Sequence, residues 1–85
     1  MKNFYNEIIN LENKKREERR RKFNEAVEKE VEIIKEKIKE IAVDEQGIRC
    51  LLYEIENYYI RNSVIETFKE YFTAYEHEKD VVIKW

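Results

Sequence analysis

The strongest constraint on the fold is a change along one face of a long predicted helix, from apolar residues to arginine. Five aliphatic residues recur at spacings of four and three, which places them in one stripe along a helix of 3.6 residues per turn: Val27, Val31, Ile34, Ile38 and Ile41. Toward the N-terminus the same stripe continues into Arg20 and Arg16. A helix that packs from residue 27 onward therefore has no packing partner before that residue. There it presents a cationic segment to a different surface.

The aliphatic stripe also has the spacing of a short coiled-coil seam. A basic helix followed by such a seam resembles a basic-zipper DNA-binding region, and this resemblance implies a dimer on DNA. The seam, however, covers barely two heptads before Asp44 and contains no Leu, and helices of this length are marginal alone. We therefore interpret it as a core or dimer seam that packs against the C-terminal helices of the same or a second chain.

Length and composition limit the chain to one small helical domain. The sequence has 85 residues, and a chain of this size buries only about 60–65% of the surface that its unfolded form exposes. Its own core is therefore small, and we expect a homodimer. Charged residues make up 42% of the chain, with one Gly and no Pro, which favours helices joined by short connections.

The net charge of −2 hides an uneven distribution of charge along the chain. Residues 14–22 contain seven basic and two acidic side chains, a net charge of +5. Residues 43–85 contain five basic and nine acidic side chains, a net charge of −4. The single domain, residues 1–85, therefore divides into a long charged helix over 3–42 and an acidic, aromatic-rich packing region over 44–85.

The polar middle of the first helix is compatible with helix because acidic residues precede basic ones by four positions. Each such pair contributes about 0.2–0.5 kcal/mol, and the sequence offers four of them: Glu12–Arg16, Glu17–Arg21, Glu18–Lys22 and Glu25–Lys29. We therefore favour a continuous helix over 3–42, and an interruption near Asn10 to Asn13 is the alternative.

A break at 42–47 separates this helix from the next element. Asp44 can cap a following helix, with Glu45 in its first turn. Two patterns then compete over residues 48–60: a helix gathers six apolar and aromatic residues on one face, whereas a strand gathers four and places Asn57 among them. We favour helix for this segment.

A second helix start is predicted at Ser63, because Glu66 three residues later completes a capping box. Apolar residues then share one helical face as far as Tyr75. Beyond His77 to Asp80 this pattern stops, and the segment from Val81 to Trp85 is strand-like. Because a lone strand cannot satisfy its backbone, this tail must pair with a neighbour, dock on the helices or stay mobile.

The sequence thus predicts a mainly α fold with a long N-terminal helix, two shorter helices and a short C-terminal strand-like tail. The alternative is an α+β fold in which residues 48–60 form a strand that pairs with residues 80–85.

The leading candidate for a binding site is the basic segment of the first helix. On a helical wheel one broad cationic face gathers Lys15, Arg16, Arg19, Arg20 and Lys22. Such a face can follow phosphate groups of DNA or RNA, dock on an acidic protein surface, or simply remain solvated, which is the commonest outcome for a charge run of this kind.

Aromatic residues concentrate in the C-terminal half, where eight of the eleven lie between Tyr53 and Trp85. We expect an aromatic core or interface formed by Phe68, Tyr71, Phe72, Tyr75 and Trp85. Stacking on nucleic-acid bases is the less favoured role, because the surrounding charge is acidic.

No group of residues indicates catalysis, a metal or a cofactor. His77 lies among adjacent carboxylates that do not share its helical face, Cys50 has no other candidate base than His77, and Gly47 stands alone, without a glycine-rich phosphate loop. We therefore expect a protein that is not an enzyme, with no catalytic residue, no metal site and no cofactor.

One cysteine and no long apolar run are typical of a cytoplasmic, soluble protein with no membrane partner. Small charged domains of similar composition are common among regulators and inhibitors of phages and mobile elements. The expected function is a non-enzymatic interaction protein, a homodimer that binds or blocks a larger macromolecule. A protein partner is favoured, and the alternative is nucleic-acid binding by the arginine-rich face at residues 14–22.

Overall fold

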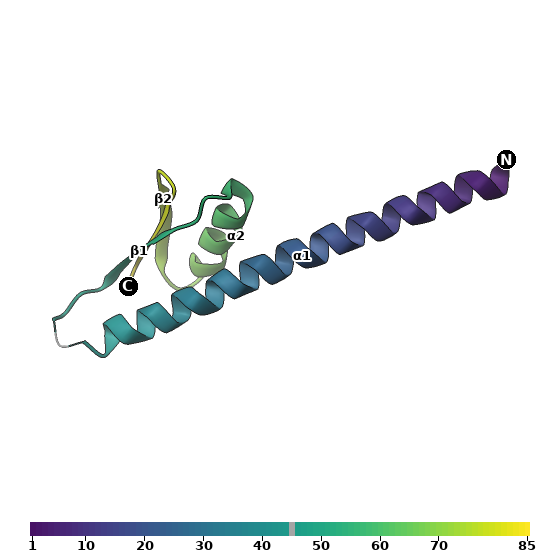
Figure 1. Ribbon diagram of the computed structural model, residues 1–85. Coiled ribbons are helices and arrows are strands. Elements are labelled where there is room, and N and C mark those ends of the chain that lie inside the picture. Colours follow the sequence, from purple (N-terminus) through teal and green to yellow (C-terminus); the bar gives the residue numbers. More distant parts are fainter. Residues whose placement is uncertain (45) are drawn as a thin grey trace.

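The computed structural model describes residues 1–44 and 46–85 and shows an α+β fold (Figure 1). Its elements follow the order α1 (Lys2–Ala42), β1 (Cys50–Glu54), α2 (Tyr58–Phe68), β2 (Thr73–His77) and β3 (Asp80–Lys84). The mainly α prediction is therefore correct for the long first helix and incomplete for the second half, where three strands form a sheet.

Helix α1 dominates the shape of the molecule. It runs unbroken for 41 residues, which corresponds to about 60 Å, and the whole molecule measures 68 × 23 × 21 Å. Figure 1 shows the C-terminal half of α1 beneath α2 and the sheet, whereas its N-terminal half extends away from them. Below, residues 2–22 are called the arm and residues 23–85 the domain.

The predicted continuity of the helix is confirmed, although the expected i,i+4 pairs do not account for it. In the described residues, the ion pairs of α1 shorter than 4.0 Å are the i,i+3 pairs Glu32–Lys35, at 3.2 Å, and Glu36–Lys39, at 3.3 Å. Both are exposed, so each contributes less than about 1 kcal/mol. Helix propensity of the many Glu, Lys and Arg residues supports the arm instead.

The three strands form an antiparallel sheet in the order β1-β3-β2, with the C-terminal strand in the centre. Leu51 pairs with Ile83, and Ala74 pairs with the same residue from the other side. Because β3 is central, Val81, Val82 and Ile83 are all buried. The strand-like tail predicted from the sequence is thus confirmed, and its backbone is satisfied by two neighbours.

The helix predicted over residues 48–60 is wrong except at its last three residues, which begin α2, and the alternative of a strand paired with the tail is correct over Cys50–Glu54. Leu51 and Tyr53 pack against the core while Leu52 is 63% exposed, which is the two-residue alternation of a strand. The apolar run fits both periods locally. Pairing with β3 decides between them, and no local pattern contains that information.

Helix α2 begins earlier than the sequence predicted. The Oδ1 atom of Asn57 accepts hydrogen bonds from the backbone N–H groups of Tyr59, at 2.9 Å, and Ile60, at 3.2 Å. Asn57 is therefore the N-cap, and the predicted capping box at Ser63 is wrong because Ser63 lies inside the helix. One helix replaces the two shorter ones that the sequence predicted.

Helix α2 also ends earlier, at Phe68, so the helical face predicted to reach Tyr75 is wrong beyond this residue. The backbone N–H of Phe72 bonds to the carbonyl of Phe68 at 2.9 Å and closes the end of the helix. Tyr75 then lies in β2, where it pairs with Val82. A strand here completes the second side of the central β3, which a longer helix would leave unpaired.

No described helix starts at Asp44, so the cap predicted there is also wrong. Its Oδ1 accepts a hydrogen bond from the N–H of Gln46 at 3.2 Å, a turn interaction. Glu45, which was expected in the first turn of that helix, lies outside the described residues.

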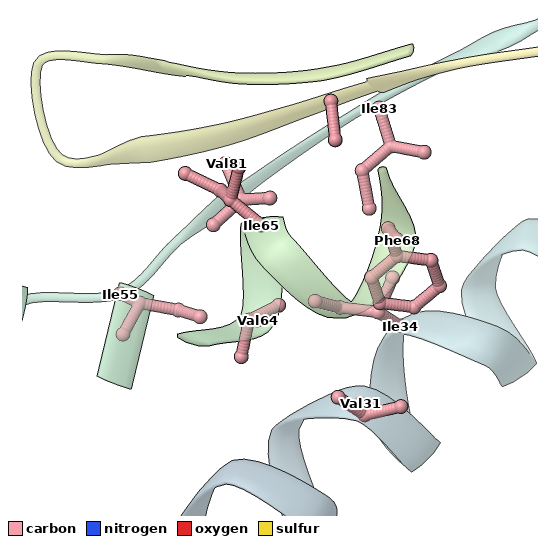
Figure 2. Close-up of a cluster of buried hydrophobic side chains, with 9 residues drawn as sticks. Val31, Ile34, Ile55, Val64, Ile65, Phe68, Val81 and Ile83 are labelled. Carbon is pink, nitrogen blue, oxygen red and sulfur yellow. The ribbon is translucent and has the colours of Figure 1, made fainter. Parts of the chain in front are cut away.

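The core lies where α2 meets both α1 and the sheet. Figure 2 shows Phe68 of α2 between Ile34 of α1 and Ile83 of β3, and Val64 of α2 belongs to the same buried cluster. Ile34, Val64 and Ile83 have no exposed surface. Because these side chains come from three elements, the C-terminal half of α1 is held to the domain while the arm is not.

Candidate interaction surface

The predicted basic face lies on the arm and is open to solvent. All of its members are exposed: Lys15, Arg16, Arg19, Arg20 and Lys22. Figure 1 shows this part of α1 extending beyond α2 and the sheet. The structure therefore brings these residues together on one free helix.

The cations of the arm are not neutralised by neighbouring acids. Within the described part of the chain, the ion pairs below 4.0 Å involve Lys35, Lys39, Arg61 and Lys69, and no side chain of residues 14–22. The net charge of +5 over nine residues thus faces water. An exposed cationic helix of this kind attracts anionic groups, with a strength that depends on ionic strength.

Apolar side chains at the tip of the arm are exposed as well. Phe4 is 61% exposed, Ile8 38% and Leu11 54%. Their spacing of i, i+4 and i+7 is the spacing of anchor residues in helices that bind in grooves. At about 100° per residue, these three residues lie on the same side of the helix as Lys15 and Lys22. The stripe was visible in the sequence, but its exposure became evident only from the fold.

The seam predicted on α1 faces α2 of the same chain. Val31 and Ile34 are buried in the core, Val27 and Ile38 are half-buried against it, and Ile41 is half-buried near the end of the helix. These contacts explain why the stripe is apolar from residue 27 onward and cationic upstream.

The predicted aromatic group is divided by the structure. Phe68 is buried and meets Phe72 edge to face, with ring centroids 5.9 Å apart. Phe72 in turn meets Trp85, at 6.5 Å. Tyr71, which is 83% exposed, and Tyr75, which is 40% exposed, lie outside the core of the chain. Three members of the predicted group therefore pack together, and its two tyrosines lie on the surface.

Arg61 is a buried charge that the sequence analysis did not single out. Its Nη1 donates to the carbonyl of Ile55 at 2.6 Å, and its Nε donates to the carboxylate of Glu76 at 2.9 Å. These bonds join the start of α2 to the end of β1 and to β2. The available signal was that Arg61 is the single basic residue between Tyr58 and Phe68, a segment that also contains the apolar residues of the core. Because this guanidinium is already paired, it serves the fold rather than a partner.

Tyr53 joins β1 to α1. The carboxylate of Glu30 raises the pKa of Tyr53 to about 12, first through side-chain hydrogen bonding, with burial and the negative charge of Glu30 adding to the effect. The neutral phenol is therefore the form that stabilises the contact between β1 and α1.

Cys50 and His77 lie at opposite ends of the sheet. The register pairs Cys50 with Lys84 and His77 with Asp80, so four residues of β3, about 13 Å, separate the two rows. His77 is therefore too far away to activate the thiol. In the part of the chain that the structure describes, no group of three or more His, Cys, Asp or Glu side chains could hold a metal ion.

The described helices contain no stretch that is long and apolar enough to cross a membrane. Comparisons with protein-family models, with curated proteins and with solved structures found no match to this chain.

Proposed function

We propose that the chain is a small, non-enzymatic interaction protein that acts as a homodimer and binds or blocks a larger macromolecule through its arm. The observation that supports this proposal is the exposure of residues 2–22, apart from the half-buried Ile9, on a helix that packs against α2 only downstream of them. A helix with this much charge and exposed apolar surface gains stability when a partner covers it.

The favoured partner is a protein with an apolar groove bordered by acidic residues. Burial of Phe4, Ile8 and Leu11 would contribute about 1.5–3 kcal/mol per side chain. Lys15 and Lys22 lie on the same side of the helix as these apolar residues and would border the groove. The arginines Arg16, Arg19 and Arg20 point toward other sides of the same stretch of helix and would add a faster approach to an acidic surface. Two features disfavour a phosphate backbone, namely the acids Glu17 and Glu18 within the basic segment and the net charge of −4 on residues 43–85.

The decisive variant replaces Arg16, Arg19 and Arg20 by Gln. Its matched control replaces Lys35, Lys37 and Lys39 by Gln, which removes the same charge from the half of α1 that the domain holds. Partner capture from nuclease-treated host extract should fail for the arginine variant and persist for the lysine control. Equal capture by both variants would contradict a role for the arm.

The second candidate is nucleic-acid binding, which the consecutive arginines Arg19, Arg20 and Arg21 favour. Fluorescence anisotropy with labelled DNA and RNA pools tests it. Phosphate contacts predict a loss of affinity of about 10³-fold or more between 50 and about 200 mM salt for six or more contacts. Absence of binding even at low salt would exclude this candidate.

A further inference from the structure

Strand β1 forms one edge of the sheet, and its hydrogen bonds to β3 follow a fixed alternation. The N–H of Trp85 donates to the carbonyl of Arg49 at 3.2 Å, and the N–H of Ile55 donates to the carbonyl of Lys79 at 2.9 Å. In an antiparallel ladder, alternate residues of a strand bond to the same neighbour. The odd-numbered residues of β1 therefore bond to β3.

The even-numbered residues of β1 direct their backbone groups away from the sheet. These residues are Cys50, Leu52 and Glu54. Among the described residues, no hydrogen bond occupies their N–H or carbonyl groups. An unpaired row of this kind is a template for another strand.

The opposite edge of the sheet is formed by β2. In β2 the alternation directs the backbone groups of Ala74 and Glu76 outward. Ala74 is buried, and the carboxylate of Glu76 binds Arg61 on α2. Four of the five residues of β2 are exposed, against two of β1, so burial alone does not separate the two edges. They differ at the central residue of each strand, where Leu52 of β1 is 63% exposed and Tyr75 of β2 is 40% exposed.

Strand β1 carries little protection against edge pairing, since its one charged residue is Glu54 at its end. It contains neither Lys nor Pro, and its central side chain, Leu52, is 63% exposed. Natural sheets protect open edges with charges, prolines or bulges. An edge whose central side chains are apolar and uncharged is instead suited to adding a strand.

The sequence of β1 is complementary to itself when read in opposite directions. Antiparallel pairing about the central residue places Leu52 opposite the second copy's Leu52 and Cys50 opposite the second copy's Glu54. Leu51 then faces the second copy's Tyr53, so both faces keep apolar contacts and no like charges are opposed.

Charges in the neighbouring strand are complementary in the same arrangement. Within one copy, Lys84 lies beside Cys50 and Asp80 lies beside Glu54. Antiparallel pairing therefore aligns the row containing Lys84 with the second copy's Glu54 and Asp80. This row contains, in order, Lys84 and Cys50 of one copy and Glu54 and Asp80 of the second copy. The two-fold symmetry repeats the same row at the other end of the interface.

We propose that a second copy of this chain pairs with β1 through its own β1, which joins two three-stranded sheets into one antiparallel sheet of six strands. The pairing is isologous, with its two-fold axis at Leu52. Across the open face it extends the apolar row of Tyr75, Val82 and Leu52 into the second copy. This inference rests on the homodimer in the proposed function and specifies its interface.

The interface is small, because each strand has five residues and only three of them direct backbone groups outward. Interfaces well below about 1,200 Å² of total buried area are typical of weak or transient association. The expected dissociation constant of the dimer is therefore in the micromolar to millimolar range. Each dimer carries two arms.

The first test is sedimentation of the full chain between about 1 µM and about 1 mM, the range of weak affinities. The wild type should shift from monomer to dimer. Leu52→Lys places two like charges opposite each other at the axis and should weaken the dimer at least about tenfold. The matched control is Tyr75→Lys, on the same face of the other edge strand, which should dimerise as the wild type does.

Two results would overturn the proposal. A wild type that remains monomeric throughout the concentration range excludes the β1 interface. A dimer that Tyr75→Lys weakens as much as Leu52→Lys does indicates stacking of the open faces instead of edge pairing. Circular dichroism of each variant checks that the domain is folded.

A cross-link tests the register directly. Opposed residues in a bonded antiparallel pair have Cα atoms about 5.5 Å apart, within the range of a disulfide. In a Cys50→Ser background, Leu52→Cys should form a disulfide-linked dimer under mild oxidation, whereas Tyr75→Cys should not. Equal cross-linking of the two variants would contradict the proposed axis.

The arm variant separates this inference from the proposed function. Arg16→Gln with Arg19→Gln and Arg20→Gln should lose the partner yet keep the dimer. The Leu52→Lys variant should still bind the partner, because each monomer retains its own arm. If the arm variant retains the partner while Leu52→Lys still abolishes the dimer, the proposed function fails and the β1 interface stands.

Discussion

The two halves of α1 have the same secondary structure and opposite surroundings. Downstream, Val31 and Ile34 lie in the core and fix the helix to α2. Upstream, Phe4 and Leu11 belong to an apolar stripe of similar spacing, yet both side chains are more than half exposed. The comparison teaches that an apolar stripe on a helix identifies a face that needs a partner but not where that partner is.

The largest effect should come from a cavity in the domain. Ile34→Ala removes a side chain with no exposed surface at the contact between α1 and α2. We expect a loss of about 3 kcal/mol in the free energy of unfolding, measured by urea denaturation. A loss below about 1 kcal/mol would mean that α1 is not held to the domain as tightly as its burial indicates.

Loss of the buried guanidinium should follow closely. Arg61→Ala leaves the carbonyl of Ile55 without its donor and Glu76 without its counterion. Because Glu76 is partly exposed, water compensates in part, and we expect a loss of about 2 kcal/mol. Urea denaturation measures this loss, and the control is Lys69→Ala, which breaks the exposed ion pair between Lys69 and Glu66. Equal losses in the two variants would show that Arg61 has no special role.

A smaller, pH-dependent effect should come from Tyr53. Its pKa is raised to about 12 from an ordinary value of 10.0, so its stabilising contribution is complete below pH 10 and disappears as pH rises toward about 12. Solvent screening near the surface reduces this contribution to about 1 kcal/mol. The free energy of unfolding of the wild type, measured by urea denaturation, should fall as pH rises over this interval. Tyr53→Phe should show less of this decline, and an unchanged pH profile would contradict the contact with Glu30.

The smallest effect should come from the arm. Leu11→Ala removes a side chain that is already 54% exposed, so the free energy of unfolding should change by less than about 0.5 kcal/mol. Hydrogen exchange should likewise show weak protection in residues 2–22 and strong protection near Ile34. Strong protection of the arm in a monomeric sample would show that the two halves of α1 do not differ as described.

Much of the helical architecture followed from local patterns. The stripe from Val27 to Ile41 and the pairs of opposite charge predicted a continuous α1. The break after Ala42 and the strand-like tail were also visible. Among candidate site residues, the basic face could be identified because seven cations within nine residues require no tertiary information.

The errors lie in segments whose residues suit both helix and strand. Leu51 and Ile55 satisfy either period, and Ser63 with Glu66 imitates a helix start inside α2. Arg61 escaped notice because its partners lie up to 15 residues away. Each of these features depends on contacts with distant segments.

The long α1, the position of its charge and the need of its apolar stripes for a partner could be predicted from the spacing of residues along one helix. That residues 50–54 form a strand, that β3 is central and that Phe4, Ile8 and Leu11 are exposed became evident only from the fold. The physical reason is that a short segment acquires its conformation from the backbone groups and apolar surfaces that distant segments place beside it.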